Sequence, residues 1–247
     1  MIAPLFSADG AFVSAQSAFG AGIESCASAD GLSAFNGSGT ELVIWQRTLP
    51  RQFRAWLEDL DPSALPHERF LVRPSEARCA VETVLTESGM PDGDMRALLV
   101  DDIDDLVSRF AEITHSEFVD VRLERISHDS CWKFHRDNVA ARLLATYRGS
   151  ATQWIQPSHA EQAMHEQKDY NGPIETLQSN DVAIFKGRAA ASGSGIVHRS
   201  PPIAGTGQTR LLLCLNQRSE ISPAPWPTNQ GDKAQLFAPP GFPTGRR

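Results

Sequence analysis

The sequence predicts an α+β fold in which N-terminal helices pack on a β-rich core. Between residues 51 and 114, apolar residues recur every three or four positions, as along the buried side of amphipathic helices. From residue 117 the pattern changes to short apolar or alternating runs separated by turns, which indicates strands. Helices that precede a β-rich region favour a chain in which the helices cover one side of a sheet.

Composition and charge describe an ordinary globular chain. Its 247 residues suffice for one sizeable domain, with 41% apolar and 21% charged residues. The net charge of -7 gives no reason to expect nucleic-acid binding, and no apolar stretch approaches the roughly 18 to 20 residues of a membrane helix. Four dispersed cysteines without C-x-x-C spacing and an N-terminus unlike a signal peptide lead us to expect a cytoplasmic protein.

The N-terminal half divides into two segments. Residues 1–40, rich in Ala, Ser and Gly, are expected to form a flexible or loosely packed lead-in, with a short helix over 14–21 as an alternative. Residues 41–116 are expected to form a helical buttress of the same domain. Its expected elements are a strand at 41–47 and helices at 53–60, 75–88 and 94–114. The aspartates of the last helix are interpreted as a solvated face: Asp101, Asp102, Asp104 and Asp105.

Residues 117–216 are expected to form the β core. The expected strands are 118–126, 141–147, 152–155, 181–186, 195–198 and 209–216. The first alternates apolar with charged residues, as a half-buried strand does. Many short strands separated by turns are typical of a barrel or sandwich. A polar loop is expected at 157–173, and residues 217–247 are expected to be an irregular proline-rich tail.

A metal site is predicted from three residues. His135 and Asp137 form an H-x-D triplet, and residues i and i+2 of an extended chain share a face. With His198, which follows an apolar strand, they make the 2-His-1-carboxylate set that suits non-haem Fe(II). The alternatives are a histidine–carboxylate pair at a turn and a plain loop histidine.

The order of H-x-D, strands, His, short loop and Arg is the one that a double-stranded β-helix requires. This jelly-roll, cupin-like barrel holds its metal in the barrel mouth. Arg210 lies 12 residues after His198 and opens an apolar strand. A guanidinium matches a carboxylate bidentately, so Arg210 is our candidate for the distal carboxylate of 2-oxoglutarate. Arg142 and Lys186 are alternatives for this role, and Arg210 can instead pair with a core carboxylate.

Six short motifs connect the chain to a known family. They are Phe134-His135-x-Asp137-Asn138-Val139, Arg142-Leu143-Leu144-Ala145-Thr146-Tyr147, Gln153-Trp154, Asp181-Val182-Ala183-Ile184-Phe185-Lys186-Gly187, His198-Arg199-Ser200-Pro201 and Arg210-Leu211-Leu212-Leu213. Over residues 40 to 216 these motifs resemble the bacterial family of domain of unknown function 1826, which has no agreed reaction. The chain also remotely resembles the 2-oxoglutarate/Fe(II)-dependent oxygenase superfamily. That resemblance implies Fe(II) on His135, Asp137 and His198, 2-oxoglutarate on Arg210, and hydroxylation of an unidentified small-molecule or protein substrate.

Other functions stay open at this point. A non-catalytic, cupin-like protein that binds a metal or small molecule uses the same ligands, because they also accept Zn(II) or Ni(II). A cupin-type hydrolase or isomerase needs a nearby acid or base, and no strand Glu is well placed. A serine hydrolase is poorly supported because there is no G-x-S-x-G motif. Cys131 suits a ligand, a redox sensor or a buried inert thiol, and Tyr147 suits a pocket or a core.

Overall fold

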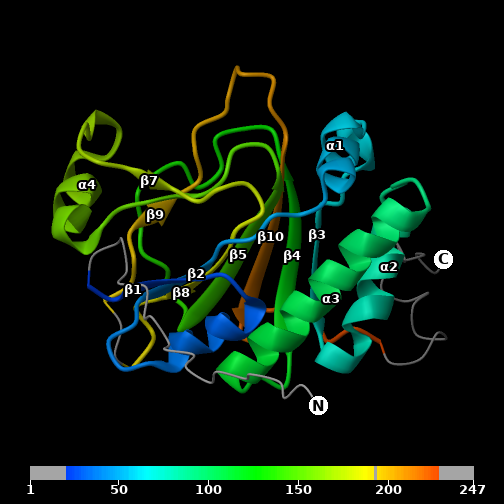
Figure 1. Ribbon diagram of the computed structural model, residues 1–247, viewed down its shortest axis with the longest axis horizontal. Helices are drawn as coiled ribbons and strands as arrows, with labels where there is room; N and C mark the ends of the chain where they lie inside the picture. The colour runs from blue at the N-terminus through cyan, green and yellow to red at the C-terminus, as the bar shows by residue number, and fades with distance from the viewer. Residues whose placement is uncertain (1–20, 192–193, 228–247) are drawn as a thin grey trace, which may run out of the picture.

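The computed structural model describes residues 21–191 and 194–227 as a mixed α/β fold (Figure 1). The helices are α1 (Arg51–Asp59), α2 (Ala77–Glu87), α3 (Asp94–Thr114) and α4 (Ala160–Glu166), with 3-10 helices η1 (Ala29–Asn36), η2 (Pro62–Ala64), η3 (Pro74–Glu76), η4 (Pro157–His159) and η5 (Gln167–Asp169). The strands are β1 (Ile23–Cys26), β2 (Leu42–Trp45), β3 (Glu68–Val72), β4 (Val119–Ile126), β5 (Ala141–Arg148), β6 (Gln153–Trp154), β7 (Glu175–Thr176), β8 (Val182–Lys186), β9 (His198–Arg199) and β10 (Arg210–Gln217).

Seven strands form a large sheet in the order β1-β2-β8-β5-β10-β4-β3. Neighbouring strands are antiparallel except for β1 and β2, which run parallel. Along β10, Leu211, Leu213 and Leu215 belong to the core under the helices, whereas Leu212 and Cys214 belong to a second core on the opposite face. Both faces of the sheet are therefore covered at β10.

The helices α1, α2 and α3 cover one face of the large sheet (Figure 1). Helix α3 buries a continuous apolar stripe, which explains why its sequence pattern predicted it over the same residues, 94–114. It begins after Gly93, whose φ of 133° disfavours other residues, and ends at His115 in the left-handed conformation with φ of 51°. Burial of this stripe holds the helices against the large sheet.

A small sheet covers part of the opposite face. Its strand order is β7-β6-β9, and it lies with α4 on the side away from α1, α2 and α3 (Figure 1). The second core joins the two sheets, because it contains Trp154 of β6 together with Leu144, Phe185 and Leu212 of the large sheet. The order of layers is therefore helices, large sheet and small sheet.

Residues 21–40 differ from the loosely packed lead-in that was expected. Strand β1 pairs with β2, and Ile23, Leu32 and Phe35 are buried. These three apolar side chains are sparse among Ala, Ser and Gly, so the composition of the segment concealed them. Residues 1–20, with most of the helix expected over 14–21, lie outside the described residues.

Strands β3 and β7 and helix α4 were not expected from the sequence either. Strand β3 is short and lies just before Pro74, and the seven-residue helix α4 lies inside the predicted polar loop 157–173. The start of the expected tail is irregular but packed: Pro225 bridges Leu71, and the Trp226 ring lies 5.5 Å from the Phe70 ring. Residues 228–247 lie outside the described residues. No helix in the described ranges combines the length and apolar character that a bilayer crossing requires.

Candidate metal site

Backbone pairing places His135 beside His198. His135 lies in the connection between β4 and β5, and His198 begins β9. Each backbone N–H donates to the carbonyl of the other residue at 3.0 Å, which forms an isolated antiparallel bridge. Their ring centroids are 4.6 Å apart. Two histidines that are 63 residues apart in the sequence are therefore direct partners across the fold.

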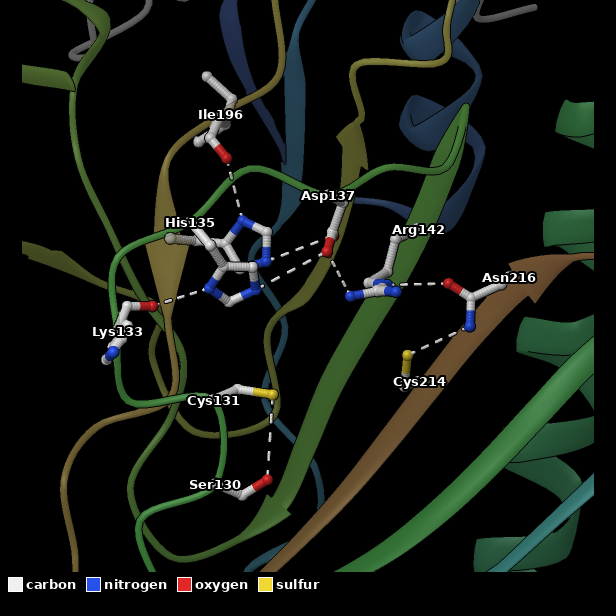
Figure 2. Close-up of polar contacts among 10 residues, drawn as sticks. Ser130, Cys131, Lys133, His135, Asp137, Arg142, Ile196, Cys214 and Asn216 are labelled. Carbon is white, nitrogen blue, oxygen red and sulfur yellow. Dashed lines mark hydrogen bonds and ion pairs between the residues drawn. The ribbon is translucent and has the colours of Figure 1, made fainter. Parts of the chain in front are cut away.

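Both imidazole rings are oriented by backbone carbonyl groups. Nδ1 of His135 lies 2.8 Å from the carbonyl oxygen of Lys133, and Nδ1 of His198 lies 3.0 Å from that of Ile196. Because a carbonyl oxygen only accepts, each Nδ1 carries a proton, and Nε2 is the ring nitrogen directed toward Asp137. Figure 2 shows these contacts and the approach of the rings to Asp137. This is the orientation that metal-ligating histidines adopt.

Asp137 supplies the third donor. Its carboxylate oxygens lie 3.8 Å from Nε2 of His135 and 3.3 Å from Nε2 of His198, and the three ligand atoms lie within 4.8 Å of one another. The Oδ2 atom is buried and makes no hydrogen bond among the described residues. As the sequence predicted, the three side chains converge, and their arrangement leaves a buried oxygen free to bind a cation.

The protonation states of the site suit metal ligation. Burial acts to raise the pKa of Asp137, but the contact with His198 and the charge of Arg142 outweigh burial and lower this pKa. Burial, with the nearby His198, also lowers the pKa of His135. At neutral pH the carboxylate is thus ionised and the His135 ring is neutral, which are the forms that bind metals.

A chain of hydrogen bonds on the large sheet holds Asp137. Nη1 of Arg142 donates to its Oδ1 at 2.5 Å, and Nε of Arg142 donates to Oδ1 of Asn216 at 2.8 Å (Figure 2). Nδ2 of Asn216 contacts Sγ of Cys214 at 3.5 Å. Arg142 is therefore occupied by Asp137, which weakens it as an alternative for the cosubstrate. Asn216 was missed, although a polar residue within the apolar run of β10 was a signal for it.

Arg210 is a buried cation without a counter-charge. Its side chain shares a face with Leu212 and Cys214, and its Nε donates to the carbonyl of Ser150 at 2.6 Å. Nη1 and Nη2 are buried and find no partner in the described part of the chain. Burial lowers its pKa to about 10, against the weaker opposing influence of Glu124. The alternative of a pair with a core carboxylate is therefore absent among the described residues.

Lys186 lies away from the site. Its Nζ donates to the carbonyl of Gly37 at 3.3 Å and lies 5.4 Å from the centre of the Phe35 ring. The neighbouring Phe185, by contrast, contacts the His198 ring, with centroids 4.9 Å apart. Because successive residues of β8 point to opposite faces, Lys186 points away from the face that carries the site.

A cavity of about 80 Å³ opens between the two sheets beside the three converging residues. Its lining includes His135, His198 and Arg142, with the hydroxyl-bearing Thr152 and Ser200. Cys131 also lines it and is exposed, with φ of 49°, so the expectation of a buried thiol is wrong. A turn before the H-x-D triplet brings this thiol to the surface; it is not among the converging metal-binding groups.

Comparison with solved structures finds distant likenesses. HygX of Streptomyces hygroscopicus with iron bound is 13% identical, with a TM-score of 0.40, and the match covers 86% of this chain and 95% of that chain. A prolyl-4-hydroxylase of Pseudomonas putida is 11% identical, with a TM-score of 0.37 and coverage of 77% and 94%. The non-heme alpha ketoglutarate dependent carbocyclase SnoK from nogalamycin biosynthesis is 10% identical, with a TM-score of 0.34 and coverage of 89% and 94%. No curated protein matches the chain by sequence.

A family model matches most of the sequence. The family is described as protein of unknown function DUF1826, and the match runs over residues 27–216. His135, Asp137, His198 and Arg210 all lie within the matched range. The chain therefore belongs to the DUF1826 family, which is the family that its short motifs resemble.

Proposed function

We propose that this protein is a non-haem Fe(II)- and 2-oxoglutarate-dependent oxygenase that hydroxylates an unidentified substrate. One observation carries the proposal: two imidazole rings, each tethered through Nδ1 to a carbonyl, present Nε2 to one buried carboxylate with a free oxygen. Two nitrogens and one carboxylate oxygen are the donor set of the facial triad for Fe(II). When bound, Fe(II) and 2-oxoglutarate together supply the activation of O₂.

The connectivity of the sheets supports a double-stranded β-helix as the scaffold. After β4 in the large sheet, the chain passes through His135, which pairs with β9 of the small sheet, and returns to the large sheet at β5. It visits the small sheet at β6 and β7, the large sheet at β8, the small sheet at β9 and the large sheet at β10. A jelly roll requires such crossing between two packed sheets, so the connectivity supports that scaffold.

Each residue has a defined part in this proposal. His135, Asp137 and His198 would hold the metal, and Arg142 keeps the Asp137 carboxylate ionised and fixed in position. Arg210 would bind the distal carboxylate of 2-oxoglutarate, because its two terminal nitrogens are buried and unpaired. This unpaired cation favours the oxygenase over a protein that binds a metal alone, since a metal cation gives a guanidinium no partner.

Anaerobic titration with Fe(II) and then 2-oxoglutarate tests the proposal. We expect wild-type protein to bind one equivalent of each, with a visible charge-transfer band when both are present. His135→Ala and His198→Ala should lose the metal, whereas His67→Ala, a matched change at an exposed histidine, should retain it. Arg210→Gln should keep the metal and bind 2-oxoglutarate at least about tenfold more weakly. Metal binding without any 2-oxoglutarate binding would contradict the oxygenase and leave the metal-binding protein.

A further inference from the structure

A second unpaired guanidinium, that of Arg122, lines the same cavity as the two histidines. Arg122 lies on β4, and its Nε is buried with no hydrogen-bond partner in the described part of the chain. No carboxylate among the described residues forms an ion pair with it. The adjacent arginine on the sheet, Arg69 of β3, is by contrast paired with Asp120 at 2.6 Å. A buried N–H donor without a partner destabilises the folded protein, so a guanidinium that carries such a donor at a cavity points to an anionic ligand.

The register of the large sheet separates Arg122 from Arg210. Arg122 lies opposite Cys214, which is two residues along β10 from Asn216, the residue that contacts Arg142. Arg210 lies opposite Ile126, four residues further along β4, or about 13 Å between backbone positions. Arg122 is therefore next to the sheet position that supports Asp137, and Arg210 is at the far end. The two cations mark two separate positions on one face.

The charges around the cavity leave room for more than one anion. Glu124 contributes a carboxylate to the lining, and Asp137, which is not among the lining residues, is already paired with Arg142. Arg199, a further cation of the lining, stacks over the Phe134 ring at 4.1 Å and donates to Gln153. 2-Oxoglutarate has one carboxylate distal to its chelating end, so Arg210 and Arg122 do not both need it.

We propose that Arg122 binds an anionic group of the substrate, which makes the substrate class a carboxylate- or phosphate-bearing molecule. The inference rests on the proposed function and adds the substrate to it. The cavity shares His135 and Cys131 with a wider surface pocket of about 370 Å³. A larger molecule can occupy that surface pocket while its anionic end reaches Arg122, beside the residues that would hold the metal.

Calorimetric titration with inorganic phosphate and, separately, acetate tests this site. The protein is first loaded anaerobically with Fe(II) and saturating 2-oxoglutarate. We expect one equivalent of at least one probe to bind, and the stronger probe identifies the anionic group. Arg122→Gln should weaken that binding by about 10- to 100-fold, with partial recovery in Arg122→Lys. Arg73→Gln, a change at a side chain that is 43% exposed, should bind the probe within about twofold of wild type.

Two results would overturn the inference. One is equal probe binding, or none, in wild-type and Arg122→Gln protein. The other is an Arg122→Gln protein that loses 2-oxoglutarate instead of the probe, because Arg122 would then be the cosubstrate residue. The proposed function fails separately, if wild type binds no 2-oxoglutarate. Titration of the metal-free protein with the same probes then still decides whether Arg122 is an anion site.

Discussion

Buried arginines on the two faces of the large sheet have opposite surroundings. On the helix-covered face, Arg47 donates through both Nη atoms to Asp102 and through Nε to the Asn180 carbonyl at 2.7 Å. The Tyr147 hydroxyl also donates to Asp102, at 2.5 Å. On the other face, Arg210 has two terminal nitrogens without partners. Pairing offsets the cost of burying a charge, whereas a buried charge that the chain leaves unpaired keeps that cost unless a ligand pairs with it.

The largest effect is expected from removing the carboxylate of the paired cluster. Asp102→Ala leaves Arg47, whose side chain is 7% exposed, without its counter-charge and should lower the free energy of unfolding by about 3–5 kcal/mol. Urea denaturation measures this value. The matched control is Asp105→Ala, which breaks a more exposed pair with Arg109 and should cost less than about 1 kcal/mol. Equal losses of unfolding free energy in Asp102→Ala and Asp105→Ala would show that the buried pair on the helix-covered face matters no more than an exposed one.

Metal binding on the face that carries His198 should stabilise the folded protein. Ni(II) at about 100 times its dissociation constant should raise the free energy of unfolding of wild type by about 2.7 kcal/mol, because it binds only the folded protein. Folded Asp102→Ala should gain as much, since its change lies on the opposite face. His198→Ala should gain nothing. A gain in His198→Ala equal to that of wild type would show that the ion binds elsewhere.

Removing an unpaired arginine should increase stability. Because burial lowers the Arg210 pKa to about 10, its charged form costs the folded protein roughly 3 kcal/mol at neutral pH. Arg210→Met should therefore raise the free energy of unfolding of the metal-free protein by about 1–3 kcal/mol, less than the full cost because the bond to Ser150 is lost.

The stability gained in Arg210→Met should depend on pH. The lowered pKa means that the cost is fully present below pH 10 and declines as the pH rises above it, where folded Arg210 gives up its proton. The advantage of Arg210→Met over wild type should decline in that range. A variant less stable than wild type at pH 7 would show that the chain does compensate this charge.

The smallest effect is expected from Tyr147→Phe. This change removes one hydrogen bond to Asp102 while Arg47 stays paired, so it should cost about 1 kcal/mol in urea denaturation. Burial raises the pKa of Tyr147 well above its usual value, so the hydroxyl remains protonated through the neutral range. Binding of 2-oxoglutarate should be unchanged. An altered affinity would mean that the two faces are coupled.

The sequence was sufficient to predict the convergence of His135, Asp137 and His198. An i, i+2 spacing places two side chains on one face in any extended segment, and a histidine after an apolar strand lies at a strand end. The helix over 94–114 was equally accessible, because its stripe of apolar residues is long.

Arg122 and Asp102 could not be assigned from the sequence. Alternation along β4 shows that Asp120, Arg122 and Glu124 share a face, but not that the small sheet covers part of it with strands from much later in the chain. Asp102 resembles its acidic neighbours in α3, and only the packing of β2 and β5 beneath the helix brings Arg47 and Tyr147 to it. Local patterns specify faces, whereas long-range packing decides what lies against them.

The mutual backbone bonds of His135 and His198 have a consequence for motion. An ion bound by both rings would add a second link between two segments that backbone hydrogen bonds already join. The segment around His135, which precedes β5, could then separate from β9 only if the ion were released. The amide protons of His135 and His198 should then exchange with deuterated water more slowly in the metal-bound protein than in the metal-free protein, because their exposure requires the two segments to separate.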